Sequence, residues 1–190
     1  AALGFSGDPA VLPLLMNNAA DPDVEIAAKA LLAAGVLASP ETPLAPLHNA
    51  AIRPDASEAM VRNAAFALFQ IAEKTRVDQN GGLAMAFLDL LRAPDEQARA
   101  QSALGLGLIR ASAAVPEITD LLAADPTPGV RTAAAWALGQ IGLRASTSAL
   151  IRALSDPDQI TAGTARGALV RIHGRDYGAS PAAWKSVEGS

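Results

Sequence analysis

The residue types that most often carry out chemistry are scarce in this chain of 190 residues. There are two histidines, His48 and His173, and no cysteine. The absence of cysteine excludes disulfides, thiolate metal sites and cysteine nucleophiles. Two histidines supply little material for imidazole catalysis or for a metal centre with several imidazole ligands. We therefore expect a protein that is not an enzyme, with no catalytic residue, no metal site and no cofactor.

The glycine and acidic motifs of common active sites are also missing. Gly105-Leu-Gly107 lacks the further glycine or lysine of a phosphate-binding loop, and Gly4-Phe-Ser-Gly7 does not have the spacing of a nucleophile elbow. In Asp78-Gln-Asn80 the nearby glycines and the terminal glutamate of a calcium loop are misplaced. Binding, and not catalysis, is therefore the expected activity.

Three arginines recur near the starts of predicted helices: Arg62, Arg99 and Arg131. Each could bind an acidic peptide, or could pair with an acidic residue in a turn and form a ladder between repeats. The candidate turn residues are Asp55, Asp95 and Asp125. We favour the ladder, because a planar guanidinium makes several hydrogen bonds at once to carboxylates and carbonyl groups.

A second series consists of the residues directly before five Ala-Leu pairs: Lys29, Phe66, Ser102, Trp136 and Gly167. Two residues after each Leu come Ala33, Gln70, Leu106, Gln140 and Arg171. At 100° per residue, Trp136 lies about 140° from the centre of the predicted buried stripe, which places it on the concave face of the protein.

Aromatic rings rimmed by Gln and Arg have the chemistry of a peptide-binding groove. We predict a partner-binding surface on the concave face, with Phe66 and Trp136 as apolar anchors. Its predicted members are Phe66, Gln70, Gln101, Trp136, Gln140, Arg166 and Arg171. The alternative is that the two aromatic residues only fill space across this face.

These positions recur because the sequence repeats itself. A proline beside an acidic residue occurs at Asp21-Pro22, Pro54-Asp55, Pro94-Asp95, Asp125-Pro126 and Asp156-Pro157, with steps of 32, 40, 32 and 31 residues between the prolines. An Ala-Leu pair follows each of them. The 40-residue step contains a polar insertion around residues 74–82, which we predict to be an exposed loop. Two markers in the same order indicate five repeats.

Each repeat has the pattern of two helices. Proline fits only the first turn of a helix, and apolar residues follow it at helical spacing. Inner helices are predicted near Val24–Leu37, Ser57–Glu73, Glu96–Arg110, Val130–Ile141 and Ile160–His173. Outer helices are predicted near Pro9–Asn17, Pro43–Ala51, Gly82–Ala93, Ala113–Ala124 and Ser146–Leu154.

The composition favours closely packed helices, since 51% of the residues are hydrophobic but only 4% are aromatic. No single hairpin can bury its apolar stripe alone, so each must pack on its neighbours. We predict an all-α, right-handed α-solenoid of about five helical hairpins. The repeat array spans residues 1–174, with repeats near 8–37, 43–73, 82–110, 113–142 and 146–173. Residues 175–190 form a C-terminal cap in which Tyr177 and Trp184 cover the last repeat.

Three segments carry a family resemblance. Val130-Arg-Thr-Ala-Ala-Ala-Trp-Ala-Leu-Gly-Gln-Ile-Gly142 resembles the inner-helix signature of HEAT repeats, in particular the short bacterial phycobilisome-lyase type. Val61-Arg-Asn-Ala-Ala-Phe-Ala-Leu-Phe-Gln-Ile71 is a close second copy, and Ala103-Leu-Gly-Leu-Gly-Leu-Ile109 is a third. The resemblance covers nearly the whole chain and implies the fold, whereas this scaffold hosts many unrelated functions.

The resemblance also offers two enzymatic comparisons. Deoxyhypusine hydroxylases hold iron with His-Glu pairs on such helices, but here Asn49 follows His48 and Gly174 follows His173. We therefore expect His173 to be a helix-terminal residue that eases the helix dipole. Bilin lyases give the repeat type its name, and a bilin lyase or lyase-like subunit is an alternative function.

Charge limits the class of partner. The net charge is −4, with −5 over residues 1–60, −1 over 61–124 and +2 over 125–190. This balance does not favour nucleic acid, and no segment has the run of about 18 apolar residues that a membrane span needs. We expect a protein-binding or scaffolding module whose partner is another protein or a peptide. The compartment is unknown.

The first residues suggest a longer parent. Ala1–Pro9 has the pattern of the end of an inner helix followed by its turn, so we expect the chain to continue a longer solenoid. A third possible function is therefore a structural segment of a larger multidomain protein or assembly.

Overall fold

The computed structural model describes residues 8–78 and 80–187. This described part contains ten α-helices and no strand, which confirms the all-α class. The predicted helical tail at residues 1–7, Gln79 in the insertion, and the last three residues lie outside the described residues.

The chain divides into two compact units, residues 1–105 and 106–190, called here the N-terminal and the C-terminal unit. The helices of the N-terminal unit are α2 (Leu12–Ala19), α3 (Val24–Leu37), α4 (Leu44–Ile52), α5 (Glu58–Thr75) and α6 (Gly82–Leu90). Helix α7 (Glu96–Leu108) contains the boundary between the units. The C-terminal unit holds α8 (Val115–Ala124), α9 (Pro128–Ile141), α10 (Thr147–Ala153) and α11 (Gln159–His173).

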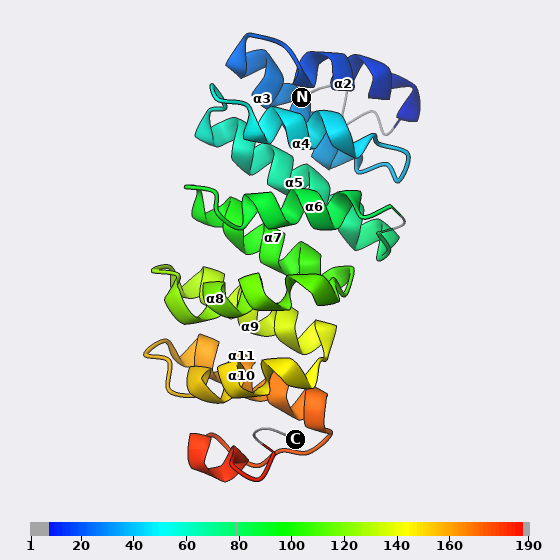
Figure 1. The fold of residues 1–190 in the computed structure, drawn as a ribbon. Coiled ribbons are helices and arrows are strands. Elements are labelled where there is room, and N and C mark those ends of the chain that lie inside the picture. Colours follow the sequence, from blue (N-terminus) through cyan, green and yellow to red (C-terminus); the bar gives the residue numbers. More distant parts are fainter. Residues whose placement is uncertain (1–7, 79, 188–190) are drawn as a thin grey trace. The chain divides into compact units, whose positions relative to one another are not determined.

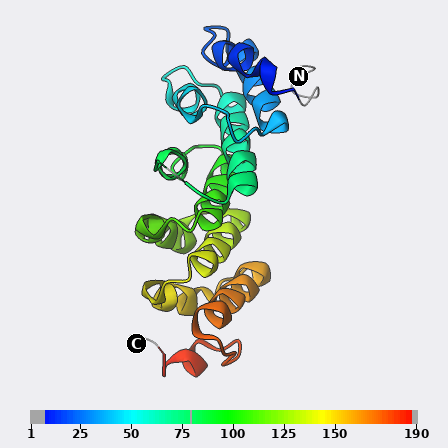
Figure 2. The same cartoon turned by 90° about the vertical axis from the view of Figure 1, so that its right-hand side faces the viewer.

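Within each unit the helices form two layers (Figures 1 and 2). In the N-terminal unit α2, α4 and α6 form one layer, and α3 and α5 pack on each other in the second. In the C-terminal unit α8 and α10 form one layer, and α9 and α11 the other. In each unit we call the exposed face of the inner-helix layer the inner-helix face; it belongs to α3 and α5 in the N-terminal unit and to α9 and α11 in the C-terminal unit. The predicted repeat boundaries remain a prediction.

The predicted helices are present with small shifts at their ends. Helix α3 has the predicted bounds, whereas α9 begins at Pro128, two residues earlier than predicted, because proline is tolerated in the first turn of a helix. Helix α8 begins at Val115 because a short 3-10 turn, Ser112–Ala114, precedes it. Helix α6 ends at Leu90, and not near Ala93.

Acidic side chains in the turns start several inner helices. Asp23 accepts hydrogen bonds from the first amides of α3, and Asp158 accepts one from the Thr161 amide of α11 at 2.8 Å. Asp95 accepts one from the Ala98 amide of α7, also at 2.8 Å. These amides have no partner within the helix, so a carboxylate oxygen satisfies them and favours the helix start.

Neighbouring inner helices approach closely at glycines. A Cβ atom placed on Gly139 of α9 would lie 2.7 Å from the Cβ and 2.9 Å from the Cα of Ala168 in α11. At Gly107 it would lie 2.8 Å from the Cα of Ala137. Such distances leave no room for a methyl group. The Ala-rich composition therefore sets how near one inner helix lies to the next.

The turns are tied together by arginines. Arg62 of α5 donates through Nε and Nη2 to one oxygen of Asp95, the residue that caps α7. Arg131 of α9 donates to both oxygens of Asp156, in the turn before α11, at 2.8 Å each. The predicted ladder between repeats is present at these two positions. Asp95 is one of the predicted acidic residues, whereas Asp156 was not among them. Each arginine pairs with the turn that precedes the next inner helix.

The C-terminal segment packs around Trp184, whose side chain is fully buried. Its indole Nε1–H donates to the carbonyl of Gly178 at 2.8 Å, and the Tyr177 ring meets it edge-on, with the ring centroids 5.0 Å apart. His173 lies 6.1 Å from the same indole and hydrogen-bonds Thr147 at 2.9 Å.

His173 differs from its expected role. Burial, together with the nearby charge of Arg144, lowers the pKa of its imidazole. The ring is therefore neutral at neutral pH, and it cannot ease the helix dipole as a cation.

The close approach at Gly139 yields a stability prediction. Gly139→Ala should lower the free energy of unfolding by about 1–3 kcal/mol, because the added methyl group meets the backbone of α11. Gly163→Ala is the matched control, since Gly163 has open space around it. That variant should gain about 0.5–1 kcal/mol from helix propensity. Urea unfolding of both variants measures the difference, and a stabilised Gly139→Ala protein would contradict the packing described.

The Arg131–Asp156 pair yields a pH prediction. Hydrogen bonds from Arg131 hold the pKa of Asp156 below its usual 3.8. The ion pair therefore stabilises the fold at pH values above 3.8, the pKa of Asp156 in the unfolded chain. This stabilisation is lost as the pH falls through the lowered pKa of Asp156 in the folded protein. Arg131→Gln should cost about 1.5–3 kcal/mol at about pH 7 and much less at about pH 2. Arg152→Gln is the matched control, because it removes the same charge from an exposed position. In urea titrations its cost should be small at both pH values.

Candidate protein-binding surface

The N-terminal unit holds three of the predicted binding residues. Phe66 and Gln70 lie one turn apart on α5 and are both half-buried. The Phe66 ring lies against Gly35 of α3, where an added Cβ would be 2.5 Å from its Cδ1. Gln101 lies on α7, and its Oε1 is buried without a hydrogen-bond partner. Phe66 thus fills the space between two inner helices while part of its ring stays exposed.

The C-terminal unit brings three other predicted residues together. Trp136 and Gln140 of α9 and Arg171 of α11 line one groove of about 290 Å³ between the two inner helices. Gln140 and Arg171 are joined by a hydrogen bond of 2.9 Å from Nη2 of the arginine to Oε1 of the amide. Their bond spans the groove from one helix to the other.

Arg166, the remaining predicted residue, has a structural partner. It donates through Nε and Nη2 to the two oxygens of Asp176, at 3.0 and 2.5 Å. Its hydrogen bonds hold the pKa of that carboxyl below the usual value. Arg166 therefore ties α11 to the C-terminal segment and does not line the groove.

Trp136 both packs on a neighbouring helix and lines the groove. A Cβ on Gly107 would lie 2.9 Å from its Cζ3, so one edge of the indole packs on α7. The ring is only half-buried, however, and it also forms one wall of the groove. The two alternatives for this residue, packing and partner binding, are thus compatible.

The floor of the groove consists of residues that were not predicted as site members: Gly139, Thr164, Gly167 and Ala168. Gly167 occupies the position that Phe66 and Trp136 hold in their own repeats. A Cβ there would meet nothing within 4 Å. The sequence could have predicted this opening, because Gly167 stands in the same series as Phe66 and Trp136 but has no side chain. The absence of a side chain leaves the floor of the groove open.

The rim of the groove offers hydrogen-bond donors. Gln140 uses Oε1 to accept from Arg171, which leaves its amide NH₂ as a donor. The Arg171 guanidinium is exposed and keeps further N–H groups. An aromatic wall, a bare helix backbone and donor groups can together bind an extended segment through its side chains and its carbonyl oxygens.

Two further properties bear on the class of ligand. Within residues 8–78 and 80–187, no group of three or more His, Cys, Asp or Glu side chains is placed to hold a metal ion. None of the helices in this part of the chain has the length and apolar character needed to cross a membrane.

Comparison with known proteins places the fold. Residues 84–170 match the family model described as HEAT repeats. These residues, slightly less than half of the chain, match HEAT repeats. A search of curated proteins finds no match. The bacterial lyase subtype remains a prediction.

Three solved structures are similar to this chain. Human deoxyhypusine hydroxylase is 25% identical with a TM-score of 0.59, and the match covers 92% of this chain and 66% of that one. The CpcE–CpcF complex of phycocyanin lyase from Nostoc sp. PCC7120 is 20% identical with a TM-score of 0.70, over 86% and 65% of the chains.

The third is a designed armadillo repeat protein in complex with the peptide (KR)4. It is 21% identical with a TM-score of 0.67, over 86% of this chain and 82% of that one. The likeness to it and to the lyase shows the fold, a helical solenoid of the armadillo and HEAT type. The chain spans just under two thirds of the lengths of the hydroxylase and the lyase.

The geometry of the groove predicts a fluorescence result. Trp136 is half-buried and Trp184 is fully buried, and they are the two tryptophans of the chain. Trp136→Phe should therefore remove most of the acrylamide-accessible emission and leave the blue-shifted emission of Trp184. Trp184→Phe is the matched control and should retain the accessible emission. Equal quenching of wild type and Trp136→Phe would show that the groove wall is shielded from solvent.

Proposed function

We propose that this protein is a non-catalytic HEAT-repeat module that binds an extended segment of another protein on its inner-helix face. The observation that carries the proposal is the groove between α9 and α11, with Trp136 as one wall and Gly167 in its floor. In this proposal an apolar or aromatic side chain of the partner stacks on Trp136 and occupies the space above Gly167.

The rim would then orient the bound segment. Gln140 and Arg171 present N–H groups, and carbonyl oxygens of a peptide backbone accept from such donors. The single charge among the residues lining the groove is that of Arg171. A neutral or acidic segment would fit this rim better than a basic one, because like charges in an interface are repulsive.

The N-terminal unit would offer a separate surface. Phe66 and Gln70 display a partly exposed ring and an amide on α5, and the half-buried Gln101 lies on α7. We propose these three residues as a second set of contacts. We assign Arg166 a supporting function, because it holds the segment that follows α11.

One comparison supports a binding role. The designed armadillo repeat protein was solved in complex with the peptide (KR)4, which supports peptide binding by a scaffold of this type. The likeness to the lyase complex rests on fold alone. The groove lining holds no His, Cys, Asp or Glu, and its one hydroxyl group, that of Thr164, donates to the Ile160 carbonyl within α11.

Filling the groove tests the proposal directly. Peptides are first selected on the wild-type protein from a phage-displayed random library. Gly167→Leu should then weaken their binding by about tenfold or more, because the new side chain occupies the space above the helix. The free energy of unfolding should not fall, since Gly167 lies in open space and leucine favours the helix.

Gly163→Leu is the matched control. It lies one turn earlier on α11, is also exposed with open space around it, and does not line the groove. It should retain the binding of wild type. Selected peptides that bind Gly167→Leu as tightly as wild type, with Gly163→Leu unchanged, would contradict the proposed site.

A further inference from the structure

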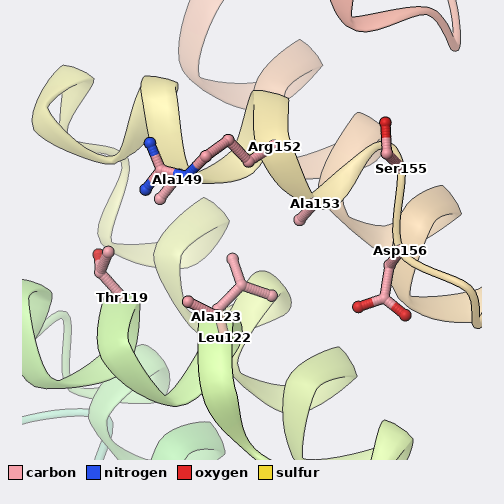
Figure 3. A pocket seen from close by; sticks show the side chains of 8 residues that line it. All are labelled: Thr119, Leu122, Ala123, Ala149, Arg152, Ala153, Ser155 and Asp156. Atoms are coloured by element: carbon pink, nitrogen blue, oxygen red, sulfur yellow. The ribbon is translucent and has the colours of Figure 1, made fainter.

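A second cleft lies on the opposite layer of the C-terminal unit, between the outer helices α8 and α10 (Figure 3). It has a volume of about 220 Å³. Its lining residues come from α8, from α10 and from the turn after α10, and none of them lines the groove between α9 and α11. The cleft is therefore separate from the proposed peptide groove.

The walls of this cleft are apolar and short. Ala123 of α8 faces the gap together with Ala149 and Ala153 of α10, and Leu122 lies at its base. Leu122, Ala149 and Ala153 are each less than a tenth exposed. Because three of these four side chains end at Cβ, the two helices leave space that an aliphatic side chain of a ligand can fill.

The ends of the cleft carry opposite charges. Figure 3 shows the Arg152 guanidinium extending towards Thr119, whereas the Asp156 carboxylate lies at the other end, beside Ser155. Asp156 is already paired, because both of its oxygens accept from Arg131 and one also accepts from the Asp158 amide. Its charge is therefore neutralised within the fold.

Arg152 is different. Its side chain is exposed, and no hydrogen bond or ion pair joins it to any part of the chain that the structure describes. By contrast Arg131, Arg166 and Arg171 of the same unit each have a side-chain partner. An unpartnered guanidinium beside an apolar cleft is complementary to a ligand that carries an anionic group next to an aliphatic one.

We propose that this cleft binds an acidic segment of a partner protein, with an aliphatic side chain between α8 and α10 and a neighbouring carboxylate on Arg152. The planar guanidinium matches a carboxylate in a two-point hydrogen bond. A phosphate group, with about twice the charge, is less suited, because Arg152 is the single cationic side chain of the lining.

Nuclear magnetic resonance of the ¹⁵N-labelled full chain tests this proposal. The probe is the blocked peptide Ala-Glu-Leu-Glu-Ala, added up to about 1 mM, the weak end of specific recognition. The amide signals of Thr119, Ala123, Ala149 and Ala153 should shift. The peptides Ala-Gln-Leu-Gln-Ala and Ala-Glu-Ala-Glu-Ala, which lack the charge or the aliphatic group, should shift them far less.

Two variants locate the binding, and each has a control. Arg152→Gln should weaken the peptide by about tenfold, whereas Lys185→Gln removes an exposed charge outside the cleft and should not. Ala123→Leu should block the cleft without unfolding the protein, because Ala123 is exposed. Ala124→Leu, an exposed neighbour outside the cleft, should leave the affinity unchanged.

Three outcomes would overturn the proposal. The first is the absence of shifts at the cleft residues with the acidic peptide. The second is an equal response to the glutamine peptide, which would show that the carboxylate is not recognised. The third is a shift pattern at Gly139, Gln140 and Gly167, which would place the peptide in the groove between α9 and α11 and would support that site instead.

Discussion

The close approach of neighbouring inner helices is the constraint on which the rest of this structure depends. At Gly139 and Ala168, and at Gly107 and Ala137, backbone meets backbone with no room for another methyl group. Small residues allow the helices to approach this closely. The leucine and isoleucine side chains of the apolar stripe are then buried between the helices. A glycine also lies on the exposed face of α11, where Gly167 forms part of the groove floor beside Trp136. Packing and the proposed recognition thus arise from one property of the sequence.

Polar interactions fix the turns that this packing brings together. Asp95 both caps α7 and accepts from Arg62, so one carboxylate starts a helix and links two repeats. Asp156 accepts from Arg131 and from the Asp158 amide, and Asp158 in turn caps α11. Each arginine therefore stabilises the start of the next inner helix. The hydrogen bonds between Arg131 and Asp156, whose side chains are both little exposed, are stronger than those of a typical surface ion pair.

The helices and the turns were predictable because they depend on local signals. Proline, acidic caps and apolar spacing placed α3 correctly and the other helices within a few residues. The details of the site depend on contacts between repeats, which no local signal carries. The pairing of Arg166 with Asp176, the neutral state of His173 and the opening above Gly167 each require a neighbour from another element. The cleft at Arg152 went unpredicted for the same reason, since it needs α8 and α10 side by side.

The proposed function rests on the inner-helix groove of the C-terminal unit, and a crystal structure of the chain with a selected peptide tests it most directly. The account predicts that a side chain of the peptide lies against the indole of Trp136 above Gly167, with a backbone carbonyl within hydrogen-bond distance of Gln140 or Arg171. A peptide bound elsewhere on the protein, with the groove between α9 and α11 empty, would contradict it.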